Sequence, residues 1–147
     1  MDGSRKNIEA HYDLSNQFVR LFPGESMMYS GALWERENET LEQAQWNKLD
    51  RICRVLGLGP EDHVLEIGSG WGAFAIHAAS RYGCRVTATI SREQFALAQE
   101  RARAAGLEGR VTLLLEDYRH LSKEDSAREF RSRCLSRAGL CRCRRLR

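Results

Sequence analysis

The chain has 147 residues, of which 42% are hydrophobic and 29% are charged, and its formal net charge is +3. This length allows one domain with a single core, and the composition is typical of a soluble globular protein. No run of about 18 apolar residues is present, which excludes a membrane-spanning helix. The polar first ten residues lack the apolar core of a signal peptide. We therefore expect a cytoplasmic protein whose five cysteines are reduced.

The positive charge is concentrated at the C-terminus. Residues 122–147 contain nine of the 23 basic and three of the 20 acidic residues, leaving 14 basic and 17 acidic residues in the rest. A mildly acidic body is not typical of a specific nucleic-acid-binding domain. Sequence-blind binding of polyanions by the eight tail arginines is a non-catalytic alternative. Three tail cysteines lack a second pair of ligands, so no metal site is predicted.

The N-terminal part is predicted to be helical. Residues 8–22 show a loose helical pattern, which Pro23-Gly24 ends. Thr40 and Gln43 form a capping-box pair. Apolar residues at helical spacing follow them and predict an amphipathic helix that ends at Gly57.

Strands and helices alternate after residue 60. Strands are predicted at residues 63–67, 85–90 and 111–115, with helices at 74–82 and from 92 to about 105. This alternation indicates βαβ units and a parallel sheet. No apolar periodicity persists after Leu121, so we expect residues 122–147 to be a disordered basic tail. Its composition is that of an aberrant segment, such as an altered reading frame would produce.

A glycine-rich turn follows the first predicted strand and carries the main chemical signal. Residues 64–72 read Val-Leu-Glu-Ile-Gly-Ser-Gly-Trp-Gly. Glycines at alternate positions let the chain turn sharply and let a ligand approach the backbone, and the following helix offers free N–H groups. The third glycine comes one residue too early for a dinucleotide-binding turn. The turn, with Glu66 before it, resembles motif I of class I S-adenosylmethionine methyltransferases; a plain tight turn is the alternative.

Polar residues after the next two predicted strands are candidates for the rest of this cofactor. The second strand ends without an acidic residue for the ribose, but Thr89, Ser91 and Gln94 follow there. The Gln94 amide can donate to and accept from a ribose diol, and it also fits a capping box with Ser91; the two roles can coexist. Asp117 and Tyr118 offer a carboxylate and an aromatic face to adenine, with an ordinary strand-end turn as the alternative.

Short sequence motifs before and after the turn indicate one family among the class I methyltransferases. Residues 11–16 read His-Tyr-Asp-Leu-Ser-Asn, residues 28–30 read Met-Tyr-Ser, and residues 40–45 read Thr-Leu-Glu-Gln-Ala-Gln. With the Gly-Trp-Gly turn and Thr-Ile-Ser-Arg-Glu-Gln at 89–94, they resemble the cyclopropane-fatty-acyl-phospholipid synthase and mycolic acid cyclopropane synthase family. The resemblance covers about residues 8–121.

The resemblance implies a Rossmann-like α/β class I methyltransferase fold, truncated after about three parallel strands. Residues 1–60 would form an N-terminal helical lid, and residues 61–121 a partial domain that binds S-adenosyl-L-methionine. Family enzymes transfer the methyl group to a cis double bond of a phospholipid acyl chain, at the membrane surface, and then close a cyclopropane ring. The implied cofactor contacts are Tyr29, Ser30, Glu66, Gly68, Gly70, Trp71, Gly72, Thr89, Ser91, Gln94, Asp117 and Tyr118.

The chain departs from the family where the family's catalytic base lies. A cysteine that follows the Tyr-Ser word in the family, near a bound bicarbonate, is replaced by Gly31, and later base-site residues have no counterpart. No catalytic residue is therefore assigned, and we expect this chain by itself to be inactive. The strand at 63–67, which is central in the family, is expected to have one open edge. A small-molecule N-methyltransferase is the alternative enzyme.

Overall fold

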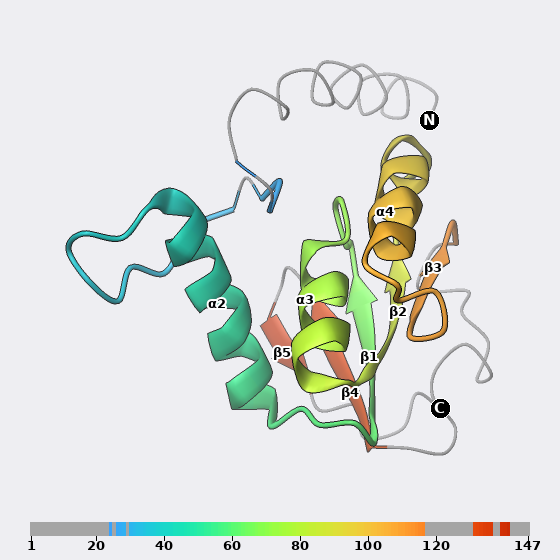
Figure 1. The fold of residues 1–147 in the computed structure, drawn as a ribbon. Helices are drawn as coiled ribbons and strands as arrows, with labels where there is room; N and C mark the ends of the chain where they lie inside the picture. Colours follow the sequence, from blue (N-terminus) through green and yellow to red (C-terminus); the bar gives the residue numbers. More distant parts are fainter. Residues whose placement is uncertain (1–23, 25, 29, 117–130, 137–138, 142–147) are drawn as a thin grey trace, which may run out of the picture. The chain divides into compact units, whose positions relative to one another are not determined.

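A computed structural model of the chain describes residues 24, 26–28, 30–116, 131–136 and 139–141 (Figure 1). The chain divides into two compact units, residues 1–47 and 48–147, and each is described by itself. The helix predicted at residues 8–22 lies outside the described residues. Within the described part, no helix has both the length and the apolar character needed to cross a membrane.

Helix α2 (Leu41–Leu56) begins at the predicted capping box. The backbone N–H of Thr40 donates to Oε1 of Gln43 over 2.8 Å, and the N–H of Gln43 donates to Oγ1 of Thr40 over 3.2 Å. Gly57 follows the last helical residue with a φ of 60°, a left-handed conformation that ends the helix. Both predicted ends of this helix are confirmed.

Five strands of the second unit form one sheet in the order β3-β2-β1-β4-β5. Strands β1 (Asp62–Ile67), β2 (Arg85–Thr89) and β3 (Val111–Leu114) are parallel, and helices α3 (Ala73–Tyr82) and α4 (Arg92–Ala104) connect them. These five elements were predicted from the sequence, with ends that differ by one or two residues.

The last two strands were not predicted. Strand β4 (Arg131–Ser136) lies parallel to β1 and pairs with it along its whole length, and β5 (Gly139–Cys141) pairs antiparallel with β4. The expectation of a tail without regular structure is therefore wrong for these residues, and β1 does not have the expected open edge. The physical reason is that strand pairing satisfies backbone N–H and C=O groups, which every residue type except proline supplies in full.

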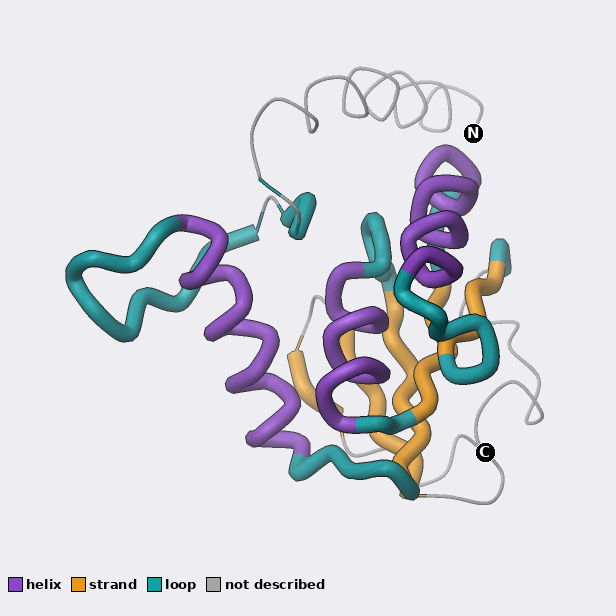
Figure 2. Tube along the Cα trace, in the orientation of Figure 1, coloured by secondary structure: helices purple, strands orange, loops and turns teal. Residues whose placement is uncertain are grey.

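Small and β-branched side chains let α3 lie close to the sheet. Val64, Val86 and Ala88 are at most 1% exposed, and the α3 residues Ala75 and Ala78 are fully buried. Figures 1 and 2 show α3 and α4 on the same face of the sheet. Because β1 and β2 are parallel, their carboxyl ends meet at one edge, which brings the β1–α3 turn next to the β2–α4 junction.

Candidate cofactor-binding site

The glycine turn joins β1 to α3 at this carboxyl edge. Gly68, Gly70 and Gly72 have φ values of 79°, 60° and 78°, in the region that favours glycine. A Cβ at Gly68 or Gly70 would meet no atom within 4 Å, whereas a Cβ at Gly72 would lie 3.4 Å from Cβ of Ala98 in α4. The first two glycines therefore leave room for a ligand beside the backbone, and the third permits close packing of α4.

Strand β2 holds the turn through Thr89, its last residue. The backbone N–H of Gly68 donates to Oγ1 of Thr89 over 3.2 Å, and the N–H of Ser69 donates to the Thr89 carbonyl over 3.0 Å. Thr89 is 6% exposed. Its hydroxyl, predicted as a cofactor contact, serves in the structure to fix the start of the turn.

Glu66, near the end of β1, is a buried acid with an unused acceptor. Glu66 is 7% exposed, and its Oε2 atom has no hydrogen-bond partner among the described residues. Burial raises the pKa of the Glu66 carboxyl to about 7, and the Ser69 hydroxyl acts in the opposite direction. A buried carboxylate oxygen without a partner is costly. The site therefore favours a ligand group that donates a hydrogen bond or carries positive charge.

Gln94, in the first turn of α4, presents an unused donor. The hydroxyl of Ser91 donates to Oε1 of Gln94 over 3.0 Å, while Nε2 of Gln94 is buried without a partner in the described part of the chain. Ser91 makes no side-chain bond to the helix backbone, so the predicted capping box at Ser91 is wrong. The competing side-chain bond orients the Gln94 amide and leaves its N–H groups for a ligand.

Trp71 is buried within the turn, at 2% exposure, and its carbonyl accepts a hydrogen bond of 2.7 Å from Nη1 of Arg101 in α4. The contact of Trp71 with the cofactor stays a prediction. Sequence reasoning did not identify Arg101, because a helical pattern does not show which of several arginines reaches back to the turn.

In the first unit, Ser30 is positioned by Gln45 of α2. The Gln45 amide, which is 3% exposed, donates to the Ser30 carbonyl over 2.9 Å and lies 3.4 Å from the Met28 carbonyl. The predicted cofactor contact of Ser30 stays a prediction. Tyr29, Asp117 and Tyr118 lie outside the described residues.

The arrangement at the carboxyl edge can hold a small polar ligand. It combines room beside Gly68 and Gly70, the buried acid Glu66, and the amide donor of Gln94. The acceptor and the donor match the amine and a hydroxyl group of an amino-acid nucleoside. Within the residues that the structure describes, no group of three or more His, Cys, Asp or Glu side chains could hold a metal ion.

The sequence profile of the mycolic acid cyclopropane synthetase family matches residues 2–129. The chain belongs to this family. It is 42% identical over 118 residues to a probable fatty acid methyltransferase of Pseudomonas putida, covering 80% of this chain and 30% of that protein. It is 45% identical over 115 residues to the cyclopropane-fatty-acyl-phospholipid synthase of Escherichia coli, covering 78% of this chain and 29% of that protein.

The fold agrees with this family. A crystal structure of a mycolic acid cyclopropane synthase complexed with SAH and CTAB matches with a TM-score of 0.73 and 34% identity, over 80% of this chain and 41% of that one. The predicted fold class, a truncated Rossmann-like class I methyltransferase, is confirmed. The chain spans about 30% of the length of the curated relatives that it matches.

Proposed function

We propose that this chain binds S-adenosylmethionine at the turn between β1 and α3, and that it is the cofactor-binding part of a lipid methyltransferase. Two buried atoms that have no hydrogen-bond partner in the described part of the chain carry the proposal: Oε2 of Glu66, near the end of β1, and Nε2 of Gln94, in the first turn of α4. The room beside Gly68 and Gly70 supports it, because the ligand can then lie against the backbone.

Each residue of the site has a role that follows from its free groups. Glu66 accepts from the positively charged amine of the methionine portion, and Gln94 donates to a ribose hydroxyl. Because Gly68 and Gly70 have no side chain, the ligand can approach backbone N–H groups near the start of α3. When bound, the cofactor supplies an electrophilic methyl group for transfer.

The names of the relatives support an acyl chain as the acceptor. One is a probable fatty acid methyltransferase and another a cyclopropane-fatty-acyl-phospholipid synthase. We propose the double bond of an unsaturated phospholipid acyl chain, reached at the membrane surface in the cytoplasm. The chain covers 30% and 29% of these two relatives, and we propose that the acceptor pocket and the catalytic base lie in the remaining parts.

Cofactor binding is tested with S-adenosylhomocysteine and a Gly70→Val variant of the whole chain. A branched side chain at Gly70 occupies the space of the ligand, so we expect calorimetry to show no binding. Gly106→Val is the matched control, because Gly106 also has a positive φ of 69° and open space around it but follows α4. Equal affinity of Gly70→Val and the unchanged chain would contradict the assigned site.

Turnover is tested with labelled S-adenosylmethionine and vesicles of unsaturated phospholipid. We expect binding without methyl transfer by the 147-residue chain, and transfer once the downstream half of a relative is joined to it. An amine acceptor in a parallel assay tests the N-methyltransferase alternative. Turnover by the 147-residue chain above that of Gly70→Val would refute the expected inactivity.

A further inference from the structure

The conformation of the glycine turn depends on the direction of the peptide group that joins Trp71 to Gly72. Trp71 lies between Gly70 and Gly72, whose φ values of 60° and 78° both fall in the left-handed region. Glycine is the most conformationally free residue. A constraint on the Trp71–Gly72 peptide plane from outside the turn therefore adds to the hydrogen bond that its N–H makes with Ser69.

Arg101 supplies such a constraint from the next helix. Its Nη1 atom lies 2.7 Å from the carbonyl oxygen of Trp71, a short bond with a charged donor. The same peptide plane carries the N–H of Gly72, which donates to the Ser69 carbonyl over 3.1 Å. Fixing the Trp71 carbonyl therefore also fixes the direction of an N–H group at the start of α3.

The packing around the turn makes this constraint rigid. Gly72 lies against Ala98 of α4, one helical turn before Arg101. The Trp71 side chain is 2% exposed and cannot move without opening the core. Helix α4 thus holds the turn at two points, by contact at Ala98 and by a hydrogen bond at Arg101.

We infer that Arg101 is a positioning residue for the cofactor: it holds the Trp71 carbonyl toward α4 and keeps the turn in its ligand-binding conformation. This inference rests on the proposed function. Loss of the Arg101 bond would free the Trp71–Gly72 peptide to change direction, which would also disturb the bond from the Gly72 N–H to Ser69. Preorganisation of the turn therefore raises cofactor affinity.

The test compares variants of the whole chain, with S-adenosylhomocysteine as the probe in calorimetry. Arg101→Met keeps the length and apolar stem of the side chain but removes the donors, so we expect affinity to fall about tenfold. Arg101→Lys keeps a positive charge and a donor but lacks the planar guanidinium. Its affinity for S-adenosylhomocysteine should therefore lie between those of the unchanged chain and Arg101→Met. Arg103→Met is the matched control on the same helix, because the Arg103 side chain is 69% exposed and forms a surface ion pair with Glu108.

Nuclear magnetic resonance of the free chain gives a second, independent readout. The amide signals of Gly70 and Gly72 should shift in Arg101→Met and stay in place in Arg103→Met. Wild-type affinity in Arg101→Met, or unchanged glycine signals, would overturn the inference. If Arg101→Met does not fold, unchanged affinity of Arg101→Lys overturns it instead.

Different results would contradict the proposed cofactor binding and the proposed role of Arg101. Absence of S-adenosylhomocysteine binding by the unchanged chain refutes the proposed function, and the glycine signals then still decide whether Arg101 positions the turn. Binding by the unchanged chain with equal affinity of Arg101→Met and Arg103→Met refutes only the role of Arg101.

Discussion

At the scale of single residues, the buried carboxyl of Glu66 links the cofactor site to the stability of the fold. Burial raises its pKa from 4.5 to about 7 in the folded chain. Between these values the folded chain binds a proton that the unfolded chain has released. The free energy of unfolding therefore falls as pH rises through this range, and it is highest for this group below about pH 4.5.

Replacement of Glu66 by glutamine should remove this pH dependence. Glutamine keeps the shape of the protonated acid but does not ionise, so we expect Glu66→Gln to be more stable than the unchanged chain at pH 8 and similar near pH 5. Urea unfolding midpoints between pH 5 and 8 measure the effect. His63 and His77, whose pKa values burial lowers, act with the opposite sign, but their contribution is common to both proteins. Parallel curves for the two proteins would contradict the raised pKa.

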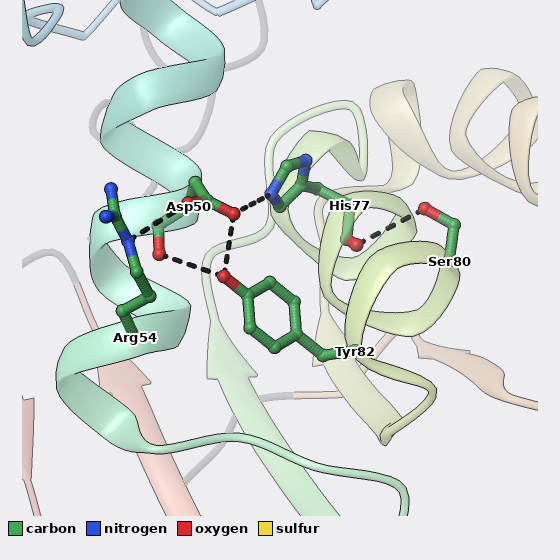
Figure 3. A network of polar contacts seen from close by, with 5 residues as sticks. All are labelled: Asp50, Arg54, His77, Ser80 and Tyr82. Carbon is green, nitrogen blue, oxygen red and sulfur yellow. Dashed lines mark hydrogen bonds and ion pairs between the residues drawn. The ribbon is translucent and has the colours of Figure 1, made fainter.

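At the scale of elements, a polar network joins the end of α2 to α3 within the second unit (Figure 3). The Tyr82 hydroxyl donates to Oδ1 of Asp50 over 2.6 Å, and Nε of Arg54 lies 3.0 Å from Oδ2 of the same carboxylate. Nε2 of His77 lies 3.7 Å from Oδ1. The Tyr82 hydrogen bond, with Arg54 and His77, lowers the pKa of Asp50, whereas burial and Asp50 raise the pKa of Tyr82 to about 12.

Loss of the Tyr82 hydroxyl should weaken this contact between helices. Tyr82→Phe keeps the ring and removes the donor to Asp50, so we expect the free energy of unfolding to fall by about 1–2 kcal/mol. Ser80→Ala is the control, because the Ser80 hydroxyl donates to the His77 carbonyl of its own helix. Urea denaturation measures both. A loss no larger than that of the control would mean that the network does not hold α2 against α3.

At the scale of the whole sheet, β4 and β5 extend the sheet beyond β1, on the edge opposite β2. The pairing runs from Asp62 opposite Arg131 to Ile67 opposite Ser136. Without it, β1 becomes an edge strand that exposes unpaired backbone groups of a parallel sheet. The stability of the glycine turn depends on this strand, because β1 leads directly into it.

A chain that ends after residue 121 should therefore be less stable and should self-associate. We expect a lower urea midpoint and a larger mass in light scattering than for the unchanged chain. A chain that ends after residue 141 is the control, because it loses basic residues but keeps β5. If the shorter chain stays monomeric with an unchanged midpoint, pairing of β4 with β1 contributes nothing to stability.

Local interactions explain what could be predicted from the sequence. The capping box at Thr40 and Gln43 and the glycine after α2 act within a few residues, so the ends of α2 followed from the pattern. The alternation of strands and helices between residues 61 and 115 and the spacing of the glycines predicted the parallel sheet and the position of the cofactor turn. In contrast, charge and apolar periodicity did not predict the strands after Leu121, because pairing between backbone groups requires neither.

Contacts between distant residues were decided only by the tertiary structure. The sequence does not distinguish Gly72, which packs on Ala98, from Gly70, which faces open space. It predicts a capping role for Ser91, whereas the hydroxyl bonds the Gln94 side chain. It also does not show that Arg101 reaches Trp71, 30 residues away. Each of these depends on which residues the packing of helices against the sheet brings together, and short-range patterns in the chain do not encode that choice.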